Sequence, residues 1–93
     1  MFKRVLIRIR ERIRNRQYIM TQHARKEMND DQLTIFDVEH AILSGEIVER
    51  QRDHETLEPK YRIEGESLEG VPIETVVKIS PTGKVVILTV YRL

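Results

Sequence analysis

The sequence predicts an α+β fold in which N-terminal helices pack on one face of a four-stranded, mainly antiparallel sheet. Up to residue 45, apolar residues recur at spacings of three and four, as they do on the buried side of a helix. From residue 46 onward they alternate with polar residues, as in strands. A chain of 93 residues is enough for one core but not for two, so we expect a single domain over residues 1–93.

Two periodicities compete in the first element, residues 1–16. The arginines alternate, as in a strand, at Arg8, Arg10, Arg12, Arg14 and Arg16. The apolar residues follow helical spacing at Phe2, Val5, Leu6, Ile9 and Ile13, with Ile7 off this stripe. Arginine favours helices, and a strand would place Glu11 among the apolar positions, so we predict a helix whose arginines spread over its solvent side.

Residues 21–45 carry the start and stop features of two further helices. Thr21 is a typical N-cap for a helix that runs to about Asn29. Thr34 is the next N-cap, and Asp37 three residues later forms a short capping box. Gly45 is expected to end this third helix as its C′ residue.

The sheet is expected within residues 46–93, and its open face depends on one hairpin. The four strands are predicted at 46–52, 61–65, 73–80 and 84–93. Alternation places Ile73, Val77 and Ile79 toward the helices, and Arg62 and Lys78 on the opposite, open face. A three-residue loop that pairs Ser80 with Lys84 would put Arg92 on the open face and Thr89 and Tyr91 inside. A two-residue Thr-Gly loop would reverse this, but Pro81 favours the first register.

Charge is distributed very unevenly along the chain. Residues 1–26 hold nine Lys and Arg and one acidic residue, whereas residues 27–93 hold seven basic and fourteen acidic ones. The net charge of +1 therefore hides a basic end of +8 and an acidic remainder of −7. The basic end suggests a polyanion or an acidic protein as a partner.

Several classes of protein do not fit this composition. The chain has no cysteine, which excludes disulfides, thiolate metal sites and a cysteine nucleophile, and is compatible with a reducing cytoplasm. The longest apolar run, residues 85–88, is too short to cross a bilayer. His23, His40 and His54 follow no metal-ligand spacing, so neither a metal nor another cofactor is expected.

An ordered set of short motifs resembles one bacterial family. The motifs are Tyr18-x-x-Thr21-x-His23-Ala24-Arg25-x-x-Met28, Asp37-Val38-x-x-Ala41-Ile42-x-x-Gly45-Glu46-Ile47-Val48-Glu49, Tyr61-x-Ile63-x-Gly65 and Val86-Ile87-Leu88-Thr89-Val90-Tyr91. Together, over about residues 9–93, they resemble the family named domain of unknown function 4258. The resemblance implies a RelE-like fold, in ααα-ββββ order here, similar to RelE- and MqsR-type ribonuclease toxins.

The resemblance implies a toxin-like endoribonuclease that needs no metal ion. In such enzymes the 2′-hydroxyl of the RNA attacks the neighbouring phosphate, and the protein moves protons and neutralises the phosphorane. The candidate catalytic residues are His23, Arg25, Tyr91 and Arg92, and the candidate RNA-binding residues are Arg8, Arg12, Arg62 and Lys78. His23 and Arg25 point apart in a regular helix, as Tyr91 and Arg92 do in a regular strand. The expected partners are RNA, including ribosome-bound messenger RNA, and a cognate antitoxin protein.

Two other functions remain open from the residues alone. The basic first helix suits a non-catalytic module that binds RNA or an acidic protein. An inactive relative whose role is to form a heteromer with an antitoxin-like protein would show the same charge pattern. For His23, Arg62 and Lys78, ordinary structural contacts are the competing interpretation.

Overall fold

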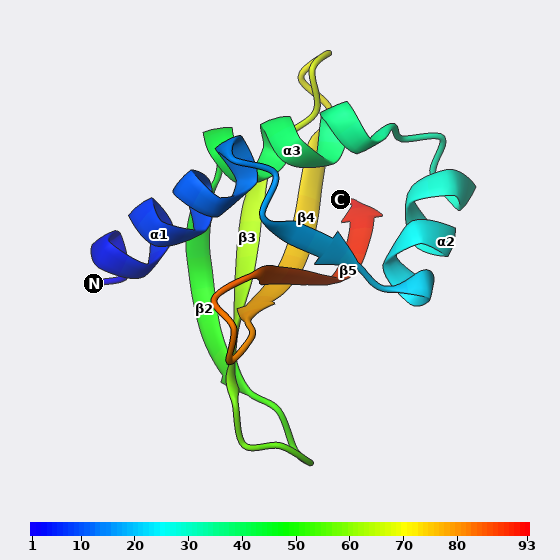
Figure 1. The fold of residues 1–93 in the computed structure, drawn as a ribbon. Helices are drawn as coiled ribbons and strands as arrows, with labels where there is room; N and C mark the ends of the chain where they lie inside the picture. Colours follow the sequence, from blue (N-terminus) through cyan, green and yellow to red (C-terminus); the bar gives the residue numbers. More distant parts are fainter.

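The computed structural model describes residues 1–93 as an α+β fold of three helices and one five-stranded sheet (Figure 1). Its elements are α1 (Lys3–Arg14), β1 (Tyr18–Met20), α2 (Gln22–Asp30), α3 (Ile35–Ser44), β2 (Glu46–Arg52), β3 (Pro59–Glu66), β4 (Pro72–Ile79) and β5 (Val85–Arg92). The α+β class is confirmed. The predicted strand count and ααα-ββββ order are wrong, because a strand lies between the first two helices.

The additional strand, β1, explains the sheet topology. The strand order is β1-β5-β4-β3-β2, and β1 runs parallel to β5 while the other pairs are antiparallel. Tyr18 lies opposite Val85 and Met20 lies opposite Ile87. Three residues show no readable alternation, and their partner lies more than sixty residues away, so local sequence does not predict β1.

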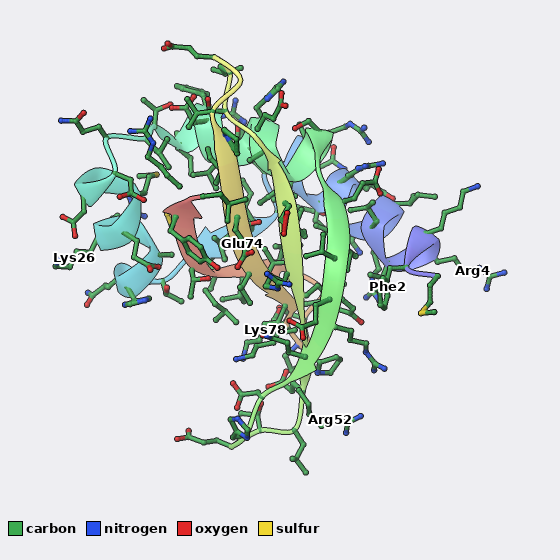
Figure 2. All side chains as sticks on the ribbon, turned by 180° about the vertical axis from the view of Figure 1, so that it is seen from behind. Phe2, Arg4, Lys26, Arg52, Glu74 and Lys78 are labelled. Carbon is green, nitrogen blue, oxygen red and sulfur yellow. The ribbon has the colours of Figure 1, made fainter.

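Helices α1 and α3 lie on one side of the sheet, α2 lies along the edge of β5, and the other side of the sheet is open. Helix α3 packs on β3 and β4, α1 packs beside it on α3, and α2 lies against β5 (Figure 1). The core between these layers includes Ile9, Ile13, Ala24, Met28, Val38, Ile42, Ile63, Val77, Ile87 and Val90. Figure 2 shows the sheet from behind, with Glu74 and Lys78 on the face that carries no helix, the open face.

Helix α1 confirms the helical interpretation of the first element but not the expected role of all its arginines. Leu6, Ile9 and Ile13 are buried, and Ile7 is 52% exposed, as the apolar stripe predicts. Arg10 Nη2 donates to the carbonyl of Gly45 at 2.8 Å, and Arg12 Nε donates to the carbonyl of Gly83 at 2.8 Å. These two side chains therefore fasten α1 to the end of α3 and to the last hairpin.

The starts of α2 and α3 confirm the predicted caps, and α3 ends at Gly45 as predicted. Thr21 and Thr34 are the N-caps, and Thr34 and Asp37 form the capping box. Gly45 has φ −90° and is not left-handed. It is needed because a Cβ there would lie 2.6 Å from the carbonyl oxygens of Ala41 and Glu64, where α3 closes on β3.

The final hairpin confirms the predicted loop, but a bulge reverses the faces beyond it. Ser80 and Lys84 pair, and Gly83 has φ +90°. Farther along, Ile87 lies opposite Val77 and Thr89 lies opposite Val76, so Leu88 is an extra residue. The strand bends there (Figure 1). The prediction that Arg92 faces outward and Tyr91 inward is wrong: Tyr91 lies opposite Glu74 on the open face, and Arg92 lies opposite Ile73.

Candidate functional site

Helix α2 is attached along the edge of β5, just beyond the end of β1. Thr21, the N-cap, accepts a hydrogen bond from the amide of Ala24 at 3.0 Å and donates to the carbonyl of Leu88 at 3.3 Å. Farther along the helix, Glu27 accepts from the amide of Val90 at 3.1 Å, and Asp31 accepts from the amide of Arg92 at 2.9 Å. The carboxylates of Glu27 and of Asp31, the C-cap of α2, thus take the place of β1 as hydrogen-bond partners along the β5 edge.

His23 lies in the first turn of α2, beside one of these anchored carboxylates. Its Nε2 is 3.2 Å from Glu27 Oε1, and its side chain is 67% exposed. Because a carboxylate only accepts hydrogen bonds, this contact favours the imidazole tautomer with hydrogen on Nε2. The Nδ1 atom of His23 is then a free acceptor on an exposed ring, and the adjacent Glu27 is held in place by the amide of Val90. This is an arrangement suited to taking up a proton.

Arg25 does not join His23. It lines a hollow with Arg16, Tyr18 and Ile35, on a different side of α2 from Glu27. In the same hollow, burial and the 2.5 Å hydrogen bond to Glu39 raise the pKa of Tyr18 to about 12. The expected divergence of His23 and Arg25 is confirmed.

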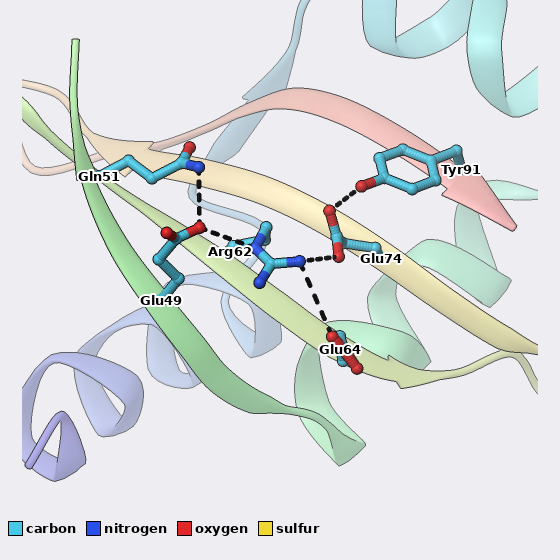
Figure 3. Close-up of polar contacts among 6 residues, drawn as sticks. All are labelled: Glu49, Gln51, Arg62, Glu64, Glu74 and Tyr91. Carbon is cyan, nitrogen blue, oxygen red and sulfur yellow. Dashed lines mark hydrogen bonds and ion pairs between the residues drawn. The ribbon is translucent and has the colours of Figure 1, made fainter. Parts of the chain in front are cut away.

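A second polar group lies on the open face, centred on Glu74 (Figure 3). Glu74 is 1% exposed, and it accepts from Arg62 Nη1 at 2.7 Å and from the Tyr91 hydroxyl. Arg62 Nε also donates to Glu49 at 3.1 Å, and its Nη1 is 3.9 Å from Glu64. The hydrogen bond to Glu74 is the main cause that raises the pKa of the Arg62 guanidinium.

The charges of the open face do not form a ready phosphate site. Arg62 is engaged by three carboxylates, and Lys78 Nζ is 3.5 Å from Glu58. A phosphate would have to displace carboxylates to reach either cation, at an energetic cost. By contrast, α1 carries four exposed basic side chains that form no ion pair: Lys3, Arg4, Arg8 and Arg14.

The structure therefore separates the predicted site residues into four places, one of which is the hollow that Arg25 lines. His23 lies beside the edge of β5. The backbone amide of Arg92, at the end of the same strand, is bound by Asp31. Tyr91 and Arg62 meet through Glu74 on the open face. Arg8 is exposed on α1, whereas Arg12 is bound to the hairpin carbonyl. Glu27, the partner of His23, binds the amide of Val90, the residue before Tyr91 in β5. No hydrogen bond joins the side chains of His23 and Tyr91.

Sequence reasoning missed the two carboxylates that organise these groups. Glu27 is four residues after His23, a spacing that places two side chains together on a helix and that makes the pair recognisable. The alternation that places Lys78 on the open face also places Glu74 there, but the near-complete burial of Glu74 depends on Arg62 and Tyr91 of the neighbouring strands. The bulge at Leu88 brings Tyr91 there.

No three His, Asp or Glu side chains gather where they could hold a metal ion. None of the three helices has the length and apolar character needed to cross a bilayer.

A family model described as Domain of unknown function (DUF4258) matches residues 20–92. The predicted family resemblance is thereby confirmed, although the match begins at residue 20 and leaves all of α1 outside it. Comparison with curated proteins and with solved structures finds no match. The likeness to RelE- and MqsR-type toxins stays a prediction.

Proposed function

The chain belongs to the family Domain of unknown function (DUF4258), and for this member we propose a toxin-like endoribonuclease activity that requires no metal ion. The observation that carries the proposal is the exposed imidazole of His23, held beside Glu27, whose carboxylate is itself fixed to the amide of Val90.

In the proposed reaction His23 is the general base. Nδ1 takes the proton of an RNA 2′-hydroxyl, and Glu27 stabilises the imidazolium that forms. The bond from the 2′-oxygen to phosphorus forms as the bond to the 5′-oxygen breaks, and the 5′-oxygen leaves with a proton from an acid group or water. The products are a 2′,3′-cyclic phosphate and a free 5′-hydroxyl.

Tyr91 is the second candidate for proton transfer, with a weaker geometric case. It is 37% exposed on the open face, and its hydroxyl donates to Glu74. Its single hydroxyl proton is already donated to Glu74, so Tyr91 would have to give up that hydrogen bond to reach a phosphate oxygen. Its removal should reduce cleavage less than the removal of His23.

The test compares two histidine variants on unlabelled single-stranded RNA, with and without EDTA. We expect His23→Gln to lower the cleavage rate by about 100-fold or more, the usual contribution of a general base. His54→Gln is the matched control, because His54 is an exposed loop histidine. Equal rates for the two folded variants, or cleavage that EDTA abolishes, would contradict the proposal.

A specific observation also favours the alternative of RNA binding without turnover. The exposed basic residues of α1 have no acidic partners, so they are available for phosphates at no cost of breaking an ion pair. An Arg8→Gln/Arg14→Gln variant should reduce the slope of log affinity against log salt by about 0.7 for each phosphate that the variant no longer neutralises. Arg50→Gln/Arg52→Gln on β2 is the matched control. Salt-dependent binding without cleavage would select this alternative.

A further inference from the structure

The edge strand β1 has one side that no other strand covers. Its other side bonds to β5, since Gln17 O accepts from the amide of Val85 and the amide of Thr21 donates to Ile87 O, both at 3.1 Å. Backbone groups alternate along a strand. The N–H and C=O groups of Tyr18 and Met20 therefore point away from β5, toward the uncovered edge.

This edge borders the hollow that contains Arg25. The hollow has a volume of about 560 Å³ and lies between β1, the start of α3 at Ile35, and Arg16 and Arg25. Both arginines are exposed and neither forms an ion pair. The edge therefore combines backbone donors and acceptors with two free guanidinium groups.

A large apolar side chain is also exposed here: Ile19 on β1 lines the hollow and is 52% exposed. The opposite edge of the sheet differs, because β2 is interrupted by a bulge between Ile47 and Glu49. Bulges protect an edge against pairing with another chain, and β1 has no such interruption.

We propose that the uncovered edge of β1 binds an extended acidic segment of a partner protein as an additional strand. Main-chain hydrogen bonds would form at Tyr18 and Met20, and carboxylates of the segment would pair with Arg16 and Arg25. A peptide backbone offers donors and acceptors at the spacing of this edge, whereas the phosphate groups of RNA offer only acceptors. The proposal does not depend on RNA cleavage.

The first measurement uses a peptide of alternating Glu and Val, acetylated and amidated, added to the full-length ¹⁵N-labelled protein. We expect saturable binding, together with slower hydrogen exchange at the amides of Tyr18 and Met20. A peptide of alternating Lys and Val is the charge control and should not bind. The absence of binding at millimolar peptide, or binding that leaves both amides unchanged, would overturn the proposal.

Two variants then separate the contributions of charge and backbone. Arg16→Glu/Arg25→Glu should weaken peptide binding by about tenfold or more, while Arg50→Glu/Arg52→Glu, the matched pair on β2, should change it by less than about twofold. Met20→Pro removes one outward N–H and should also weaken binding. Equal affinity in all variants would refute the site.

Two further outcomes also count against the proposal. If the protein dimerises through this edge, with Tyr18 and Met20 protected in a concentration-dependent manner, the occupant is a second copy of the chain. If a single-stranded RNA protects the same amides and the peptide does not, the edge binds RNA. Because His23→Gln leaves Arg16, Arg25 and the β1 edge intact, it should bind the peptide normally, which keeps this test independent of catalysis.

Discussion

Glu74 is the residue that most constrains the open face. A carboxylate that is 1% exposed needs compensation, and Arg62 and Tyr91 provide it from the neighbouring strands β3 and β5. Arg62 is therefore occupied by the protein itself, which argues against its predicted role as a free RNA-binding residue. The Arg62 side chain neutralises the buried Glu74 carboxylate within the sheet.

Removal of Arg62 should accordingly destabilise the protein more than removal of Lys78. Arg62→Met leaves the buried Glu74 carboxylate without a cation, whereas Lys78→Met breaks only the 3.5 Å contact to the partly exposed Glu58. The midpoint of urea unfolding should fall clearly in the first variant and little in the second. Adding Glu74→Gln to Arg62→Met should restore part of the loss, and a double variant no more stable than the single one would contradict this assignment.

At the scale of elements, the short strand β1 is held to the helices by a single strong polar contact. The Tyr18 hydroxyl donates to Glu39 of α3 at 2.5 Å, and its pKa is raised to about 12, first by burial and then by Glu39. Between pH 10 and 12 the unfolded chain releases the Tyr18 proton and the folded chain keeps it. The stabilisation is therefore complete below pH 10 and is lost as the pH rises toward 12.

This loss of stability at high pH gives a prediction for the Tyr18→Phe variant. The difference in unfolding free energy between the wild type and this variant should be constant from pH 7 to pH 9 and should shrink between pH 10 and pH 12. Urea titrations at each pH measure the difference, and the variant itself corrects for all other groups that titrate. Parallel loss in both proteins across that window would show that Tyr18 is not the source.

The elements that local sequence predicts are those whose features lie within a few residues. The caps at Thr21 and Thr34 and the loop at Gly83 belong to this class, since each depends on contacts close in the chain. Strand β1 and the bulge at Leu88 do not, because each is defined by a partner strand distant in sequence. One inserted residue reverses every later side chain, so Tyr91 and Arg92 exchanged faces although the hairpin was predicted correctly.

The candidate site follows the same division between local and distant contacts. His23 was found from sequence, and its partner Glu27 lies within one helical turn. The anchoring of Glu27 to Val90 joins residues more than sixty positions apart and needs the tertiary structure. The open-face cluster combines side chains from four strands, β2 to β5, which no local pattern specifies.

For the whole molecule, the main question is what α1 contributes, since it lies outside the family match yet holds most of the basic end. Its exposed side carries unpaired cations, whereas its other side buries Leu6, Ile9 and Ile13. Each such aliphatic side chain stabilises a fold by about 1.5–3 kcal/mol, so the three together contribute about 5–9 kcal/mol. The total free energy of unfolding of a small domain is only about 5–15 kcal/mol.

Deletion of residues 1–14 should therefore abolish cooperative unfolding instead of producing a folded core that lacks only the basic surface. The loss of the 2.8 Å hydrogen bonds from Arg10 to Gly45 and from Arg12 to Gly83 adds to the effect. Arg4→Gln/Arg8→Gln/Arg14→Gln is the matched control: it removes exposed charge alone and should keep the unfolding midpoint near that of the wild type. Circular dichroism during urea titration distinguishes the two proteins. A truncated chain with a sharp wild-type transition would mean that the matched region, residues 20–92, folds without α1, and that α1 is an attached binding helix and not part of the core.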